Sequence, residues 1–494
     1  MSAARLDPAA FRPLFEPRGV VVVGASSHPG KFGFVSLHNL LAAGYAGNVY
    51  GTNLEAETVL GVQTVRSVDE IPAGAADLAF VCTPASTNTE ILRACARQGI
   101  RAVFLTSAGY GESGEAGRLA EDDLVALARE LGIVLAGPNG QGLVSTPVSL
   151  CAQIVAPYPT PGRIGVASQS GNFVSSFMNW SLATGVGISR AVSAGNAAML
   201  TVADYLDYYA HDPATAVGLA YVESIGDGRA FYERVADVAT RKPLVLVKGG
   251  ATEGGARAAA SHTGALAADD KVFDGMCRQA GIARAATVEE AFEAAASFAT
   301  QPLPKGPNVV VMTTAGGWGV VTADAITRDR DLVLAPLPDD LLAQIDTKLP
   351  PRWSRNNPVD LAGSETRDTI PEVMEMIARH PGVDAVVHLG LGIQGNQARL
   401  MRQGRFYPDF GLERVVSFHE RQEVRYAEAA DELSRQTGKP ILCASELAVA
   451  DPSNPGPATV RATGRLCYAS ANRAVTALGH LYRYARFRQR RGLS

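Results

Sequence analysis

The chain lacks any apolar run close to the roughly 20 residues that a membrane-spanning helix needs, so the sequence predicts no membrane segment. Its N-terminus, as far as Arg18, contains no apolar core segment, which argues against a secretory signal peptide. The 6 cysteines are scattered, with no CxxC pair and no companion histidine cluster. This spacing argues against a zinc site and against a disulfide framework. We therefore expect no metal site in the chain and a cytoplasmic location.

The chain also has only a small excess of negative over positive charge. The formal net charge is -4 and charged residues make up 19% of the chain, so we expect no nucleic-acid partner for the protein as a whole. One local exception is the C-terminal run of Arg483, Arg486, Arg488, Arg490 and Arg491. At helical spacing, this run indicates a solvated basic face or a docking patch, with nucleic-acid binding as the less favoured alternative.

Short apolar runs alternate with segments of helical periodicity along all 494 residues. In the first third, strands are predicted at 19–24, 48–52, 78–82 and 102–106, and helices at 87–97 and 117–131. Near-continuous apolar strands that alternate with helices are typical of parallel sheets covered on both faces. The fold class predicted is therefore α/β, and the length requires roughly three domains.

We predict three doubly wound α/β domains, at residues 10–148, 149–301 and 306–494. Strands at 162–168 and 308–314 open the second and third domains, and the proline-rich segment 301–307 is predicted to be a linker. In such folds ligands bind beyond the carboxyl ends of the strands, so the loops after strands are where chemistry should lie.

The loop Gly24–Lys31 follows the first predicted strand and opens a helix. Backbone N–H groups at a helix start favour phosphate, and Lys31 adds a positive charge. The loop is not GxGxxG, and the second strand ends at Asn53, where a dinucleotide fold would have an acidic group for the ribose. The domain is thus interpreted as nucleotide-binding, with NAD disfavoured. A strand-to-helix turn without a ligand is the alternative.

Two further loops share this design. The loop Ser168–Asn172 has hydroxyls and a glycine at a helix start, which suits an anion but also suits ordinary helix caps. The loop Thr314–Gly319 opens the third domain and is another phosphate-type turn or a site of close helix–strand packing.

The most informative stretch is Ser261-His262-Thr263-Gly264, which ends a run of small residues that begins at Lys248. An imidazole on such a loop can move and is nucleophilic near neutral pH, so His262 suits a residue that collects a group at one site and delivers it at another. The alternative is a loop histidine with a structural hydrogen bond. Glu223 ends a strand in the same domain, and its position alone leaves open whether it orients the imidazole or is a surface acid.

These pieces together resemble the NDP-forming acyl-CoA synthetases, the superfamily that includes succinyl-CoA synthetase and ADP-forming acetyl-CoA synthetase. The resemblance runs from about Phe11 to about Arg488, and the order and spacing of the segments are specific although no single one is diagnostic. The segments, in addition to the loops above, are Gly137-Pro138-Asn139, Ser193-Ala194-Gly195-Asn196, Tyr221-Val222-Glu223, Lys248-Gly249-Gly250 and Asn357–Leu361.

The resemblance implies a Rossmann-like CoA-binding domain followed by two flavodoxin-like ligase domains. It also implies a missing part, because the family's ATP-grasp module has no room in this chain. We therefore expect the α subunit of a synthetase whose β subunit is a separate ATP-grasp chain, with an α₂β₂ heterotetramer as the assembly. ATP and Mg²⁺ would bind on that partner.

The implied reaction is acid + CoA + ATP giving acyl-CoA + ADP + phosphate, by way of an acyl phosphate and a phosphohistidine. The resemblance makes His262 the phosphoryl carrier and Glu223 the carboxylate that orients its ring. It places CoA at the carboxyl ends of the first domain's strands and phosphate at the loop that opens the second domain. The CoA residues expected are Gly24, Ser26, Ser27, Lys31, Thr83, Thr106, Ser107 and Asn139, and the phosphate residues are Ser168, Ser170, Gly171 and Asn172.

Three positions depart from the family pattern. Gly140-Gln141 stands where a cysteine often follows Gly-Pro-Asn, the apolar run 197–200 stands where acidic residues are frequent, and Asn53-Leu54-Glu55 loses a lysine. We hypothesise that the first two reshape the acyl pocket for a small carboxylic acid other than acetate or succinate, such as a bulkier one. The acid itself, the favoured direction and the choice of ATP or GTP do not follow from the sequence.

Two other functions compete with this one. A non-catalytic CoA-binding regulator could use the same scaffold, although it would not need both Ser261-His262-Thr263-Gly264 and Glu223. An NAD-dependent oxidoreductase is disfavoured by the absence of GxGxxG and by Asn53.

Overall fold

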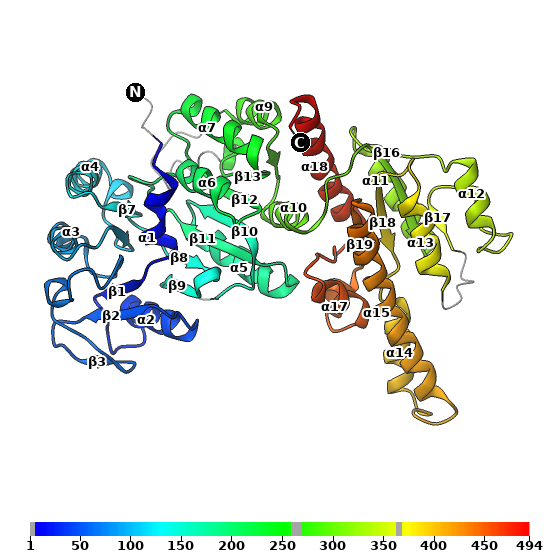
Figure 1. The fold of residues 1–494 in the computed structure, drawn as a ribbon, viewed down its shortest axis with the longest axis horizontal. Helices are drawn as coiled ribbons and strands as arrows, with labels where there is room; N and C mark the ends of the chain where they lie inside the picture. The colour runs from blue at the N-terminus through cyan, green and yellow to red at the C-terminus, as the bar shows by residue number, and fades with distance from the viewer. Residues whose placement is uncertain (1–4, 156, 256, 258–268, 362–367, 494) are drawn as a thin grey trace. The chain divides into compact units, whose positions relative to one another are not determined.

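The computed structural model describes residues 5–155, 157–255, 257, 269–361 and 368–493. Contacts between residues divide the chain into two compact units (Figure 1). The first unit comprises residues 1–183 and 187–291, and the second comprises 184–186 and 292–494. Among the described residues, the first unit contains two large sheets and a two-stranded hairpin, and the second unit contains one sheet. Each large sheet has the strand-helix alternation that the sequence predicts.

The first sheet has the strand order β2-β1-β5-β6-β7, and all its neighbouring strands are parallel. Every residue of its central strands β1, β5 and β6 is buried, as a sheet with helices on both faces requires. The strands are β1 (Gly19–Val23), β2 (Asn48–Thr52), β5 (Leu78–Val81), β6 (Ala102–Leu105) and β7 (Val134–Ala136). The helices are α2 (Phe32–Ala42), α3 (Asn88–Arg97) and α4 (Glu115–Glu130), and a hairpin of β3 (Thr58–Val59) and β4 (Val62–Gln63) follows β2.

The second sheet has the order β14-β13-β12-β10-β11-β8-β9. Its parallel part follows the flavodoxin-like order, and an antiparallel hairpin of β8 and β9 extends it beyond β11. The strands are β8 (Gly142–Ser145), β9 (Leu150–Gln153), β10 (Pro161–Ser168), β11 (Ile188–Ser193), β12 (Val217–Val222), β13 (Leu244–Lys248) and β14 (Ala283–Arg284). The helices are α5 (Gly171–Thr184), α6 (Val202–His211), α7 (Gly228–Arg241), α9 (Asp270–Ala280) and α10 (Val288–Thr300).

The N-terminal segment, with η1 (Pro8–Phe11) and α1 (Arg12–Phe15), packs against helix α6 of the second sheet. The rings of Phe11 and Phe15 stack on Tyr208 at centroid distances of 5.0 and 5.2 Å. The fully buried guanidinium of Arg190 on β11 pairs with Glu16 at 2.6 Å and with Asp212 at 3.1 Å. Because the same segment leads directly into β1, it ties the first sheet to the second within one unit.

The sheet of the second unit has the order β16-β15-β18-β19, with β17 also paired to β15. It repeats the arrangement of the second sheet, since the chain runs outward from a central strand in both directions. The strands are β15 (Asn308–Thr313), β16 (Val333–Leu334), β17 (Val359–Asp360), β18 (Ala385–Leu389) and β19 (Ile441–Ala444). The helices are α11 (Gly316–Arg328), α12 (Asp339–Asp346), α13 (Thr369–Arg379), α14 (Ile393–Gln403), α15 (Leu412–Thr437), α16 (Leu447–Ala450), α17 (Pro455–Ala462) and α18 (Ala471–Arg490).

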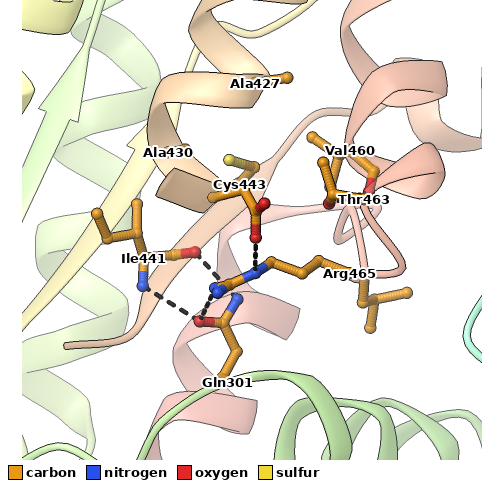
Figure 2. A pocket seen from close by; sticks show the side chains of 10 residues that line it. Gln301, Ala427, Ala430, Ile441, Cys443, Val460, Thr463 and Arg465 are labelled. Atoms are coloured by element: carbon orange, nitrogen blue, oxygen red, sulfur yellow. Dashed lines mark hydrogen bonds and ion pairs between the residues drawn. The ribbon is translucent and has the colours of Figure 1, made fainter. Parts of the chain in front are cut away.

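A buried polar network holds the segment after α10 against this sheet (Figure 2). Gln301 bonds both backbone groups of Ile441, with its Nε2 donating to the carbonyl at 3.1 Å and its Oε1 accepting from the N–H at 3.3 Å. Arg465 Nη1 donates to Gln301 Oε1 at 2.7 Å, and its Nε pairs with Asp431 at 2.6 Å. The cavity beside these groups measures only about 10 Å³, which is room for a single water at most, so it is no substrate site.

The arginines of the C-terminal run lie on or just after α18. Arg483 pairs with Asp329 at 3.2 Å, and Arg486 pairs with Asp331 at 2.7 Å. Arg491 lies over the Phe487 ring at 4.9 Å. The helix therefore uses part of its basic face within the second unit, since Asp329 and Asp331 lie in the loop after α11. No helix in the described part of the chain is long and apolar enough to cross a membrane.

The predicted α/β class, with a Rossmann-like domain followed by flavodoxin-like ones, is confirmed. The division into domains at 10–148, 149–301 and 306–494 stays a prediction, and two features bear on its boundaries. The hairpin of β8 and β9 belongs to the second sheet, so a boundary after residue 148 would cut between its strands. Residues from Phe292 onward, in the middle of α10, group with the second unit.

Candidate functional site

A cleft of about 1260 Å³ lies in the first unit, at the carboxyl ends of the strands of both its sheets. Nine of the residues predicted from the sequence line this cleft. They are Lys31, Thr83, Thr106, Ser107, Asn139, Ser170, Gly171, Asn172 and Glu223. Gly24, Ser26, Ser27 and Ser168 lie in the same loops but not in the described lining. The volume exceeds that of most small-molecule pockets, so the cleft suits a long ligand.

The turn after β1 brings its helix very close to the strand. A Cβ placed on Gly33, in the first turn of α2, would lie 1.9 Å from the carbonyl oxygen of Gly24, so only glycine fits there. Ser26 Oγ accepts from the His28 N–H at 3.1 Å, which shapes the loop, and Lys31 lies at the N-cap of α2. The N-terminus of α2 and the Lys31 ammonium are thus placed for an anion at this end of the cleft.

Asn53, which replaces the acidic residue of dinucleotide folds, has an internal role. Its Nδ2 donates to the Ala25 carbonyl at 2.9 Å, and its Oδ1 accepts from the Glu55 N–H at 2.8 Å. Asn53 therefore ties the end of β2 to the loop after β1.

The residues predicted to bind CoA after β5 and β6 are Thr83, Thr106 and Ser107. Thr106 is buried and its hydroxyl donates to the Val81 carbonyl at 2.8 Å, so it joins the ends of the two strands. The Ser107 hydroxyl accepts from Asn88 Nδ2 at 2.9 Å. Thr83 Oγ1 accepts from the Thr87 hydroxyl at 2.9 Å. These hydroxyls make the floor of the cleft polar at the edge of the first sheet.

Two turns interlock where the two sheets meet. The Asn196 N–H donates to the Pro138 carbonyl at 3.0 Å, and the Ala198 N–H donates to the Gly137 carbonyl at 3.2 Å. Asn139 Nδ2 donates to Asn196 Oδ1 at 3.3 Å. Asn196 Nδ2 in turn donates to carboxylates of the first domain, which are Glu112 at 2.5 Å and Glu121 at 2.7 Å. Asn139 is thus a joint between the two sides of the cleft as well as part of its wall.

The turn after β10 presents a helix N-terminus to the cleft. The buried Ser168 hydroxyl donates to the Ser170 carbonyl at 2.7 Å and accepts from the Ser170 N–H at 3.1 Å, and α5 begins at Gly171. Thr313 makes the same two contacts with Ala315 at the start of α11, so the second sheet and the sheet of the second unit use one design of turn. Since α5 begins in the cleft wall, its first N–H groups can bind an anion there.

Glu223 follows β12, and only 9% of its surface is exposed. It lines the cleft beside Gln169, Ser170 and Ser224. His262 lies outside the described residues, as do Ser261, Thr263 and Gly264, so the pairing of His262 with Glu223 stays a prediction.

Lys248 ends β13, where the glycine-rich stretch toward His262 begins. Its side chain is 1% exposed, its Nζ donates to the Gly250 carbonyl at 3.2 Å, and it lies 3.8 Å from Asp270. Burial lowers the pKa of Lys248. Because Asp270 opens α9, this buried ammonium links elements on both sides of the stretch.

The structure shows the surroundings of two departures from the family pattern, Gly140-Gln141 and residues 197–200. A Cβ placed on Gly140 would lie 2.6 Å from the Phe104 ring and 2.7 Å from the Ser193 carbonyl oxygen, so the glycine opens no space. Residues 197–200 pack on the hydrophobic cores and lie outside the described lining of the cleft, and their effect on the acyl pocket stays a prediction. Gln141 does line the cleft and lies against the first turn of α5, with its Nε2 donating to Asn172 Oδ1 at 3.3 Å and its Oε1 accepting from the Ser175 hydroxyl at 3.3 Å.

Sequence reasoning missed several residues of the cleft wall. Glu112, Arg118 and Glu121 come from η4 (Gly111–Ser113) and α4, after β6, and nothing in their spacing marks them. Ile154 follows β9, the strand of a hairpin that was not predicted. Gln169 sits inside the predicted phosphate loop, and its position directly after a buried strand was the available signal.

Three known families match successive parts of the chain. Residues 18–145 match a CoA binding domain, residues 161–298 match the succinyl-CoA ligase like flavodoxin domain, and residues 309–393 match a Ligase-CoA domain. The first two matches together cover both sides of the cleft.

Whole proteins match as well. The α subunit of acetate–CoA ligase (ADP-forming) I from Pyrococcus furiosus is 36% identical over 380 residues, which are 76% of this chain and 82% of that subunit. The 4-hydroxybutyrate–CoA ligase (ADP-forming) of Nitrosopumilus maritimus is 30% identical, and the match covers 76% of this chain but 54% of that longer protein. Among solved structures, the dinucleotide-forming acetyl-coenzyme A synthetase 1 of Ca. Korarchaeum cryptofilum, in complex with phosphate and ADP, has a TM-score of 0.83 at 29% identity and covers 98% of this chain and 99% of that one.

Proposed function

Because the chain belongs to the NDP-forming acyl-CoA synthetases, and within them aligns with α subunits of ADP-forming acetate–CoA ligases, we propose that it is the α subunit of an ADP-forming acyl-CoA synthetase. The observation that carries this proposal is the cleft. It joins the carboxyl edge of a CoA-binding-type sheet to the helix N-terminus and the carboxylate of a ligase-type sheet.

CoA fits the first-sheet side of the cleft. A long thiol with a pyrophosphate needs an extended groove and cationic or N–H donors at one end, and the loop after β1 offers Lys31 and the N-terminus of α2. The hydroxyls of Thr83, Thr106 and Ser107 continue the same wall toward the second sheet. CoA bound along this wall would present its thiol toward α5.

The second-sheet side suits a phosphoryl group. Ser170, Gly171 and Asn172 stand at the N-terminus of α5, where N–H groups and the helix dipole favour an anion. Ser168 shapes that turn through its two contacts with Ser170.

The reaction then runs in three balanced steps, with His262 as carrier. The γ-phosphoryl group of ATP moves to an imidazole nitrogen of His262, which releases ADP. A carboxylate oxygen of the acid takes the phosphoryl group from the histidine and forms an acyl phosphate. The thiol of CoA attacks the acyl carbon, loses its proton, and expels phosphate. Glu223 would hold the imidazole by its second nitrogen and stabilise its positive form.

ATP and Mg²⁺ belong, in this proposal, to a separate ATP-grasp β subunit, with α₂β₂ as the assembly. Support comes from the matched relatives. Those named as α subunits are covered to 82% and 80% by their matches, whereas the match to the 4-hydroxybutyrate–CoA ligase covers 54% of that chain.

The substrate is proposed to be a small carboxylic acid, with Gln141 as the part of the pocket that departs from the family. A cytoplasmic location agrees with the cysteines, since all six are described and none forms a disulfide.

The test is acyl-CoA formation by the purified chain, alone and with a co-purified ATP-grasp partner, over a panel of acids. We expect CoA binding by the chain alone, and ATP-dependent acyl-CoA and ADP only with the partner. Acyl-CoA formation by the chain alone would overturn the two-subunit proposal. CoA binding with no turnover for any acid or partner would favour a regulatory protein instead.

A further inference from the structure

The geometry points to Tyr221 as a positioning residue for Glu223, acting together with Gln169, so that the carboxylate is held ready for the loop that carries His262. This inference rests on the proposed function, because it assigns a role within the same phosphoryl-transfer site. Neither residue touches the phosphoryl group in this account, and both act through Glu223.

Tyr221 lies near the end of β12 and Glu223 directly follows the strand, so their side chains, two residues apart, fall on the same face. The Tyr221 hydroxyl donates to the Glu223 carboxylate. Burial, together with the negative charge of Glu223, raises the pKa of the Tyr221 phenol well above its usual range. The phenol therefore keeps its proton at every physiological pH and can serve as a permanent donor to the carboxylate.

The ring of Tyr221 has little freedom to leave this position. Only 9% of the residue is exposed, and its ring packs on that of Phe173, in the first turn of α5, at a centroid distance of 4.3 Å. The phenol hydroxyl is thus held between the helix proposed to bind phosphate and the carboxylate proposed to orient the histidine.

Gln169 holds the backbone of Glu223 from the other side. Its Oε1 accepts from the N–H of Glu223 at 2.6 Å and from the N–H of Ser224 at 3.1 Å. Its Nε2 donates to the Ser224 carbonyl at 3.1 Å. These three bonds cross from the end of β10 to the end of β12, which are neighbouring strands. The side chain of Glu223 is consequently positioned by a fixed backbone as well as by the phenol.

The start of the glycine-rich stretch passes directly over this pair. The Gly249 N–H donates to the Val222 carbonyl at 2.8 Å. A Cβ placed on Gly249 would lie 2.5 Å from Tyr221 Oη and 3.2 Å from Glu223 Cγ. The first residue after β13 therefore contacts both members of the pair, which connects them physically to the segment that leads to His262.

The chemical consequence follows from what a donor does to a carboxylate. A phenol that donates to one oxygen of the carboxylate fixes how the carboxylate is turned and leaves its other oxygen for the imidazole. An imidazole that becomes positively charged as it takes a phosphoryl group gains most from a carboxylate that is already in place.

The experiment uses the complex with its ATP-grasp partner and measures the rate of phosphohistidine formation over a series of Mg²⁺-ATP concentrations, by rapid quench. Tyr221→Phe keeps the ring and removes only the hydroxyl. We expect a maximal rate about tenfold lower and an unchanged KM for ATP. Gln169→Leu should lower the rate similarly.

The matched control is Tyr205→Phe, because the buried Tyr205 hydroxyl has no hydrogen-bond partner among the described residues. It should leave both the maximal rate and the KM for ATP unchanged. A Tyr221→Phe variant with the wild-type rate would overturn the inference. So would a lower rate that comes with a lower melting temperature and a changed KM for ATP, since that result signals a structural effect. If the wild-type complex itself forms no phosphohistidine, the proposed function fails instead, and the two failures are distinguishable.

Discussion

Replacing Gly249 by alanine should slow phosphohistidine formation by bringing a methyl group into the space held by Tyr221. The added Cβ would stand 2.5 Å from Tyr221 Oη, whereas a carbon in contact keeps a separation of about 3.5 Å from its neighbour. Something must therefore move by about 1 Å. The phenol cannot easily do so, because its ring packs on Phe173 at 4.3 Å.

The size of the effect follows from two costs. Overpacking of this kind costs about 1–3 kcal/mol, and a lost hydrogen bond to a charged group costs about 1.5–3 kcal/mol. Only part of either cost reaches the transition state, so we expect the rate of His262 phosphorylation to fall about 10- to 100-fold. The assay is rapid-quench phosphorylation from Mg²⁺-ATP in the complex, with melting temperature measured in parallel.

Gly254 offers a matched control five residues along the same segment, since nothing lies within 4 Å of a Cβ placed there. Gly254→Ala should leave the rate unchanged. Tyr221→Phe removes the oxygen that clashes with the added methyl group. Gly249→Ala should therefore raise the activation free energy by about 1–2 kcal/mol less in the Tyr221→Phe variant than in the wild type. Equal rates for the Gly249→Ala and Gly254→Ala variants would refute the reasoning, as would strict additivity in the cycle.

Three further predictions concern the acid, the pH dependence of stability and the second unit. The variant Gln141→Ala should raise kcat/KM for longer acids about tenfold relative to kcat/KM for acetate. The reason is that the Gln141 side chain covers the first turn of α5, with its Nε2 3.3 Å from Asn172 Oδ1. An equal change of kcat/KM for all acids would contradict this. Burial lowers the pKa of His388 to about 4, whereas an unfolded histidine takes its proton near pH 6.5, so wild-type stability should fall between those values as the pH falls. The variant His388→Leu should lose about 2 kcal/mol of that dependence in denaturant titrations at pH 7.5 and 5. Arg465→Met should lower the free energy of unfolding by about 3 kcal/mol, measured by urea titration, because it removes the buried cation that pairs with Asp431 and one of the hydrogen bonds to Gln301.

Much of the fold followed from the sequence because parallel strands buried on both faces are near-continuous apolar runs. The strand expected at 162–168 is Pro161–Ser168, and the helix expected at 117–131 is Glu115–Glu130. Strand pairing did not follow. The hairpin of β8 and β9 joins β11 through contacts about 45 residues away along the chain, which local patterns cannot express.

The candidate site, like the fold, could be predicted from the sequence only in part. Loops after strands are visible in the sequence, so Ser170, Gly171 and Glu223 could be predicted as neighbours at one edge of a sheet. The bonds from Gln169 to Glu223 form because β10 lies next to β12, and α4 contributes to the cleft wall because of how the two sheets meet. Both features depend on tertiary structure, so the sequence pattern could not predict them. Likewise, the departure at 197–200 could be read from the sequence, but the packing of these residues against the cores could not.

The central claim is that His262 carries a phosphoryl group between a partner's ATP and the acid. The most direct test is intact-mass spectrometry of this chain after incubation with Mg²⁺-ATP and the candidate ATP-grasp partner, beside a His262→Ala variant. We predict one acid-labile phosphoryl adduct on the wild-type chain, absent from the variant and discharged by the acid substrate together with CoA. An unmodified wild-type chain in a complex that binds ATP, or an adduct that persists in His262→Ala, would contradict the account.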